Sequence, residues 1–71
     1  MDLALTVNGE ERRVKREDAA SVEALLLALA VTQRRGVAVA INDAVVPKSR
    51  WSEHEVEEGD RVEIIHATQG G

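Results

Sequence analysis

The chain has 71 residues, and its 13 acidic side chains outnumber its 9 lysines and arginines, which gives a net charge of −4. A chain of this length predicts one small domain with a stability margin on the order of a few kcal/mol. The acidic balance disfavours nucleic acid and membranes as partners, because nucleic acid and anionic lipid both require a basic face. The absence of cysteine excludes disulfides, zinc–thiolate sites and thiol nucleophiles. With neither a signal peptide nor a stretch of membrane-spanning length, we expect a cytoplasmic protein.

The first predicted element is a β-hairpin over residues 3–15. Large aliphatic residues alternate with smaller ones from Leu3 to Val7, which is the period of a strand with one buried face. Asn8-Gly9 follows and is the strongest short signal for a two-residue hairpin turn. The return strand is polar and favours a sheet edge, with Val14 as its one residue expected to face inward.

A helix is predicted to follow, beginning at Ser21. Serine is a good N-cap, and an apolar stripe at helical spacing comes directly after it, consisting of Val22, Leu25, Leu26 and Leu29. Two cations and a glycine, Arg34, Arg35 and Gly36, are the expected stop signals. Leu27 lies off the stripe, and the pattern does not decide whether it is buried.

Two strands are predicted next. Val37–Ile41 alternates large and small aliphatic residues, as suits a central strand packed under a helix. Val45 and Val46 form a short strand that Pro47 ends, because proline cannot donate a hydrogen bond to a sheet.

A loop with a short helical turn then leads to the last strand, residues 61–66. Trp51 lies in the loop and is the only aromatic residue, so we expect it to cap an otherwise aliphatic core. In the last strand, Val62 and Ile64 are predicted to face the core and Ile65 to face solvent.

The order of elements predicts an α+β fold: a mixed sheet of four to five strands with one main helix packed on one face. We expect this domain to span residues 1–66. Residues 67–71 lack any apolar alternation and are expected to form a flexible tail ending in Gly-Gly.

The two terminal glycines suggest a chemical use for the tail. A backbone without Cβ atoms is thin enough to enter a narrow channel, and the carboxylate of Gly71 is unhindered. A carboxylate is a poor electrophile because it is charged, but a mixed anhydride with a nucleotide phosphate makes its carbonyl attackable. A frayed, inert end is the alternative interpretation of the same residues.

Other sites are disfavoured by the sequence. His54 and His66 lie on different elements without clustered further ligands, so we expect no metal. Ser21 is explained as a helix cap and Ser49 as a loop residue, so no nucleophile with an oriented base is evident. We therefore expect neither a cofactor nor an enzyme.

Several short stretches stand at the spacings of a known family. They are Ala40-Ile41-Asn42, Val46-Pro47, Arg50-Trp51, Gly59-Asp60 with Val62-Glu63-Ile64, and Gly70-Gly71. The N-terminal half agrees in order and length, with "VNGE" followed by a leucine-rich helix. In these features nearly the whole chain resembles the ThiS-type sulfur carriers of thiamine biosynthesis, which are ubiquitin-like proteins.

The resemblance implies a β-grasp fold and a carrier role. An ATP-dependent activating enzyme would adenylate Gly71, with Gly70 as the thin neck beside it. Sulfur would then come from cysteine through a desulfurase or from another donor, and the thiocarboxylate would serve thiazole synthase. Ile65, Thr68 and Gln69 are the predicted partner contacts, Ile65 because it faces solvent near the tail.

Three alternatives remain open from the sequence. The chain could carry sulfur for another pathway, namely molybdopterin, cysteine or tRNA thiolation. It could be a ubiquitin-like modifier joined through Gly71 to lysines of target proteins. It could also be an interaction domain whose tail is inert.

Overall fold

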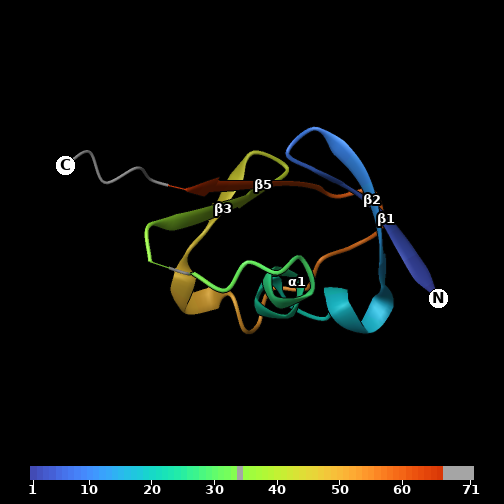
Figure 1. The fold of residues 1–71 in the computed structure, drawn as a ribbon, viewed down its shortest axis with the longest axis horizontal. Coiled ribbons are helices and arrows are strands. Elements are labelled where there is room, and N and C mark those ends of the chain that lie inside the picture. Colours follow the sequence, from blue (N-terminus) through green and yellow to red (C-terminus); the bar gives the residue numbers. More distant parts are fainter. Residues whose placement is uncertain (34, 67–71) are drawn as a thin grey trace.

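The computed structural model describes residues 1–33 and 35–66. Its elements are β1 (Asp2–Val7), β2 (Glu10–Lys15), the 3₁₀ turn η1 (Arg16–Ala19), α1 (Val22–Ala28), β3 (Val37–Ile41), β4 (Ala44–Val46), the 3₁₀ turn η2 (Lys48–Arg50) and β5 (Arg61–His66). The strands form one five-stranded sheet in the order β2-β1-β5-β3-β4. The β1–β5 pair is parallel and the other neighbouring pairs are antiparallel. Helix α1 lies against one face of this sheet (Figure 1), so the predicted mixed sheet with one helix is confirmed.

The N-terminal hairpin forms as predicted. Strands β1 and β2 pair over their whole length, and the turn residues Asn8 and Gly9 have φ angles of 51° and 84°. Positive φ at both central positions is the requirement of the two-residue turn that matches strand twist. Val14 lies opposite Leu3 and packs, half-buried, against the core.

Helix α1 begins at the predicted cap. The Ser21 side chain accepts a hydrogen bond from the backbone N–H of Ala24, with an N–O distance of 3.0 Å. The predicted stripe is the packed face: Val22, Leu25 and Leu26 are fully buried, and Leu29 packs half-buried against them. Leu27 is 58% exposed, which settles the position that the pattern left open.

The predicted helix end is wrong. The helix ends at Ala28, well before Gly36, because Ala30 adopts a left-handed φ of 64°. The N–H of Val31 then bonds the Leu26 carbonyl at 2.8 Å, and the N–H of Ala30 bonds the Leu27 carbonyl at 3.0 Å. These paired bonds are the Schellman ending, which satisfies carbonyls that a helix end leaves free.

The residue after the left-handed position explains why the helix stops there. Val31 packs against the core, the apolar contact that accompanies this ending. Gly36 has a φ of 73° and serves the turn into β3, not the helix end. Arg34, the first of the predicted stop signals, lies outside the described residues.

The core between α1 and the sheet is aliphatic, with Trp51 at its border. Trp51 is 3% exposed, and its indole N–H donates to the Val46 carbonyl at 2.9 Å, so its predicted capping role is confirmed. Two core contributors were not predicted. Ala19 of η1 and Val56 of the long loop are both buried, and the Val56 N–H bonds the Ala19 carbonyl at 3.0 Å.

We predict that Ala30→Gly stabilises the protein by about 0.5–1 kcal/mol, because a left-handed conformation strains a residue with a Cβ and does not strain glycine. The control is Ala28→Gly in the last helical turn, which should destabilise by a similar amount. Urea unfolding monitored by Trp51 fluorescence measures both. Destabilisation by both substitutions would contradict the assigned strain.

Candidate functional site

The end of β5 is the described part of the chain nearest to the predicted reacting group. Its side chains alternate as expected: Val62 and Ile64 are buried under α1, whereas Ile65 is 56% exposed on the opposite face. The strand ends at the side of the molecule away from the N-terminus (Figure 1). Gly71, Gly70, Gln69 and Thr68 lie outside the described residues, so their predicted roles stay predictions.

Ile65 belongs to a small apolar surface on the face of the sheet that α1 does not cover. Pairing places Ala38 of β3 beside Ile65, and Ala40 of β3 beside Val45 of β4, with all four on the same face. Val45 is 73% exposed. We call Ala38, Ala40, Val45 and Ile65 the open-face patch, in which Ala40 is buried, with an exposed fraction of 8%. The expected exposure of Ile65 is confirmed. Its predicted contact with a partner protein stays a prediction.

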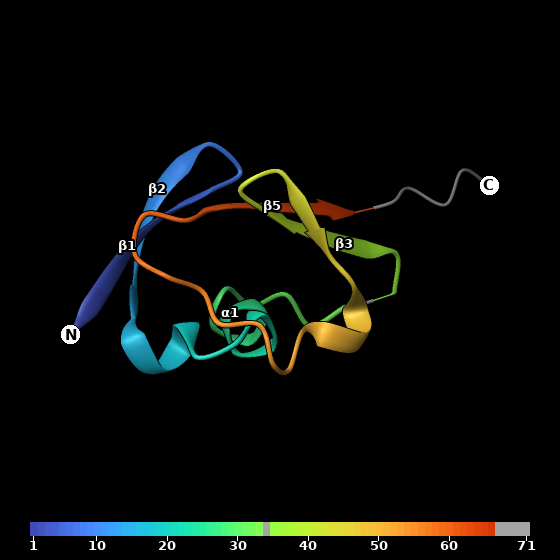
Figure 2. The same cartoon turned by 180° about the vertical axis from the view of Figure 1, so that it is seen from behind.

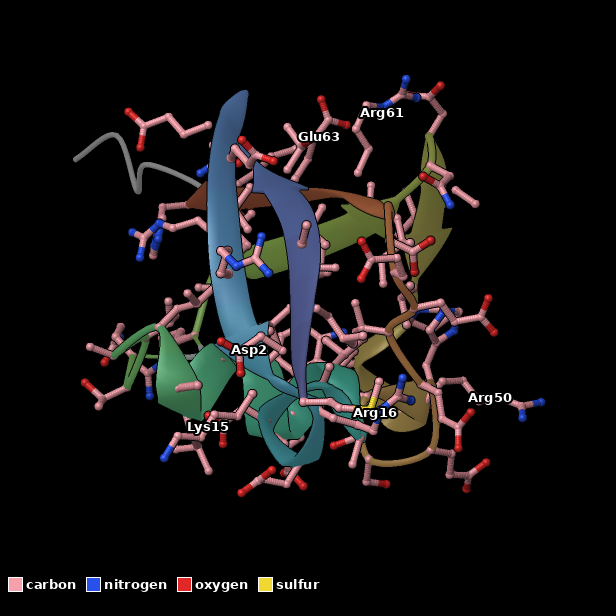
Figure 3. All side chains as sticks on the ribbon, turned by 90° about the vertical axis from the view of Figure 1, so that its right-hand side faces the viewer. Asp2, Lys15, Arg16, Arg50, Arg61 and Glu63 are labelled. Carbon is pink, nitrogen blue, oxygen red and sulfur yellow. The ribbon has the colours of Figure 1, made fainter. Side chains whose placement is uncertain are left out.

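Charged side chains border the open-face patch. Arg61 and Glu63 precede Ile65 on the same face of β5, and Figure 3 shows both on the side of the sheet away from α1. The guanidinium of Arg61 donates to the carboxylate of Asp43, so its charge is paired. The carboxylate of Glu63 lies beside Ala40 at the border of the patch, and a basic partner surface would complement its charge.

The start of β5 is fixed by the turn between β3 and β4. Asn42 has a φ of 52°, and its side-chain carbonyl accepts from the Arg61 N–H at 2.9 Å. The amide of Asn42 donates to one carboxylate oxygen of Asp60 at 3.0 Å, and the other oxygen accepts from the Glu57 N–H at 2.8 Å. Asn42 and Asp60 therefore have the structural roles that turn chemistry predicts for them.

The middle of β5 is fixed by the other turn. The backbone N–H of Asn8 bonds the Val62 carbonyl at 2.9 Å, and the Asn8 side-chain carbonyl accepts from the Ile64 N–H at 2.8 Å. The Asn-Gly signal predicts the turn itself, but nothing local in the sequence shows that its side chain reaches the last strand. Asn8 is thus a site residue that sequence reasoning missed.

The other candidate kinds of site are a cluster of metal ligands and a surface hollow that could bind a ligand. Within residues 1–33 and 35–66, no group of three His, Cys, Asp or Glu side chains could hold a metal ion. A hollow of about 350 Å³ beside β4 is lined by residues that include Val45, Arg50 and His54. Another, of about 550 Å³, lies near η1 and includes Glu57 and Glu58 in its lining. No helix in the described ranges is long and apolar enough to span a membrane.

The fold and this site together define a class. The first and last strands lie side by side and parallel within the sheet, with β2 outside β1 and the β3–β4 hairpin outside β5, and one helix crosses a single face (Figures 1 and 2). This is the β-grasp arrangement, with the C-terminal strand leading out from the sheet centre. The family model of the ThiS family matches residues 5–71, and the chain belongs to that family.

Individual relatives agree with this assignment. The crystal structure of the thiamine biosynthesis protein ThiS from Geobacter metallireducens superposes with a TM-score of 0.83 at 35% identity, covering 97% of this chain and all of that one. The sulfur carrier protein ThiS of Escherichia coli is 36% identical over 39 residues, which is 55% of this chain and 59% of the relative.

A longer relative is a thiazole synthase from Paramagnetospirillum magneticum. It is 42% identical over 69 residues, which is 97% of this chain and 20% of that protein. The chain therefore spans about a fifth of this relative's length. This relative, which is named as a thiazole synthase, therefore contains a segment similar to this domain.

We predict that Asn8→Gly destabilises the protein by about 1 kcal/mol, because it removes the acceptor for the Ile64 N–H while glycine tolerates the positive φ. Asn8→Asp is the matched control, since it keeps a side-chain oxygen at the same position. Urea unfolding and the exchange rate of the Ile64 amide proton test this expectation. Equal stability of the two variants would refute the proposed hydrogen-bond contribution.

Proposed function

We propose that this protein is a sulfur carrier of thiamine biosynthesis, whose working group is the carboxylate of Gly71. The observation that carries the proposal is the ThiS-family match, which runs through the two terminal glycines. The names of the Escherichia coli and Geobacter relatives support the same assignment. In this function the chain is a substrate and carrier for other enzymes and not itself a catalyst.

The chemistry follows from the low reactivity of a carboxylate. An oxygen of the Gly71 carboxylate attacks the α-phosphorus of ATP on an activating enzyme, and pyrophosphate leaves. A sulfur nucleophile from a cysteine desulfurase or another donor then attacks the acyl carbon, and AMP leaves. When that nucleophile is a persulfide, an acyl disulfide forms, and a reducing thiol then cleaves its S–S bond, which leaves the thiocarboxylate on Gly71 and a disulfide on the donor. The absence of cysteine in the chain means that no internal thiol competes for the activated acyl group.

Thiazole synthase is the proposed acceptor of the sulfur. The Paramagnetospirillum relative supports this choice, because a protein named as a thiazole synthase contains a segment that matches nearly this whole chain. The same relative favours the thiamine pathway over molybdopterin, cysteine or tRNA thiolation, and over attachment to target lysines. We propose a cytoplasmic location for this reaction.

The open-face patch is the proposed contact surface for these partners. Apolar side chains at the centre and charges at the rim are the usual composition of a protein interface. Ile65 is the largest exposed side chain of the patch near the end of β5. Thr68 and Gln69 are proposed to extend this contact toward the reacting end, and Gly70 to provide the narrow neck.

We predict that incubation with ATP and the activating enzyme adds AMP to Gly71, and that a sulfur donor then replaces one carboxylate oxygen by sulfur. Intact-mass spectrometry detects both changes, and fragmentation assigns them to the last residue. A variant lacking Gly70 and Gly71 is the control and should show neither product. An unmodified native mass in the presence of active enzyme would rule the carrier function out.

We predict that Ile65→Glu weakens binding to the activating enzyme about tenfold or more, because it places a charge within the apolar contact. Leu27→Glu is the matched control, since Leu27 is 58% exposed on the helix, away from the open face. Both variants should unfold within about 0.5 kcal/mol of the native protein, as surface substitutions usually do. Calorimetric titration compares them, and equal affinities would remove Ile65 from the interface.

A further inference from the structure

Strand β5 is paired unequally along its two edges. On the side of β3, pairing continues to the end of the strand, where His66 lies opposite Val37. On the side of β1, pairing covers only Arg61 and Val62, because β1 ends at Val7 and turns into β2. Figures 1 and 2 both show the β1–β2 hairpin beside the first part of β5 and not beside its end. The last residues of β5 are therefore paired only with β3, and their other edge is open although β5 is an internal strand of the sheet.

The backbone groups at this edge can be assigned from the printed bonds. The Val62 carbonyl and the Ile64 N–H both face β1, since both bond Asn8. Backbone groups alternate sides along a strand, so the Ile64 carbonyl and the His66 N–H face the same way. In the described part of the chain, no strand lies beyond Asn8 to pair with these two groups.

We propose that an extended segment of the activating enzyme adds to this edge as a further strand. It donates to the Ile64 carbonyl and accepts from the His66 N–H, in the manner of strand addition to an open sheet edge. The inference rests on the proposed function and deepens it. The edge ends at His66, which directly precedes residues 67–71 in the sequence, so a strand bound here is fixed one residue before the stretch that must enter the partner's active site.

Register is the physical advantage of such a contact. A strand advances about 3.3 Å per residue, and a slip of one residue would carry the terminal carboxylate out of line with its nucleotide. Apolar contact through Ile65 alone tolerates sliding, whereas paired backbone hydrogen bonds fix one register. Strand addition therefore sets the distance between the body of the carrier and its reacting end.

The outer edges of the sheet are poorer candidates for the same contact. The exposed side chains of β2 are mostly charged, and charged edge strands resist pairing. Strand β4 has three residues, its Val46 carbonyl is bonded by Trp51, and Pro47 follows it. The end of β5 has no such protection, and Asn8 occupies only its first free donor, the Ile64 N–H.

Amide exchange followed by NMR tests the proposal directly. In the free protein, the His66 amide proton should exchange fast, whereas the Ile64 amide is held by Asn8 and the Ile65 amide by β3. In the complex with the activating enzyme, we expect exchange at His66 to slow by about tenfold or more. An unchanged His66 rate in a complex that forms the AMP adduct would overturn the inference and leave the carrier function standing.

Variants at His66 separate the backbone group from the side chain. His66→Pro removes the N–H on the side away from β3, a position where a sheet edge tolerates proline. His66→Ala loses the imidazole and keeps the N–H, so we expect His66→Pro to bind the activating enzyme about tenfold more weakly than His66→Ala.

An ester linkage before residue 66, made by protein ligation, removes the same hydrogen without proline's fixed φ. It should match the proline variant in affinity, and native-like binding by the ester would overturn strand addition. Thermal unfolding of each variant confirms that the domain is intact. Failure of the native protein to form an AMP adduct would instead overturn the proposed function, and this inference with it.

Discussion

Two asparagines at turns hold the central strand on which the rest of the structure depends. Asn8 and Asn42 both have positive φ, at 51° and 52°, and each begins a two-residue turn between antiparallel strands. The side-chain carbonyl of Asn42 accepts from the N–H of Arg61, and that of Asn8 accepts from the N–H of Ile64. One residue type thus meets two demands, because asparagine tolerates the left-handed conformation and carries an acceptor to the neighbouring strand.

This arrangement explains how a small aliphatic domain can hold its last strand firmly. Val62 and Ile64 bury their side chains under α1. Asn8 satisfies the Ile64 N–H, which the short β1 pairing leaves over, and Asn42 satisfies the Arg61 N–H on the side of β3. Leaving the part-buried Ile64 N–H without a partner costs about 1 kcal/mol, a substantial share of the stability of a 71-residue domain, whereas the Arg61 N–H is exposed and costs less. The turns therefore contribute to the sheet centre as well as to local geometry.

The contrast between predicted and missed features has a physical cause. The Ser21 cap, the Asn8-Gly9 turn and the alternation in β5 depend on neighbouring residues, and all three were predicted correctly. The helix end was not, because Ala30 has no local preference for the left-handed conformation and adopts it so that Val31 can reach the core. Likewise, the contact of Asn8 with β5 joins residues 56 positions apart, a separation that no local pattern encodes.

The candidate site shows the same division. Exposure of Ile65 follows from alternation and was predicted, but its pairing with Ala38, and the position of Val45 two strands away on the same face, depend on strand order, which the sequence alone left open. The unpaired edge at Ile64 and His66 depends on where β1 stops relative to β5. That offset is a property of the whole sheet, so it could be recognised only once the register was known.

The partner enzymes of such a carrier must recognise its folded domain and not only its C-terminal group. A terminal glycine carboxylate is chemically ordinary and offers an enzyme nothing by which to distinguish one chain from another. Selectivity must then come from surfaces that the folded domain holds at a fixed distance from that group. In the function proposed for this protein, the open-face patch is such a surface, and strand addition at the edge of β5 fixes its register. Because Asn8 and Asn42 hold β5 against the sheet, the same bonds that stabilise the domain also fix His66, the residue after which the proposed reacting end begins.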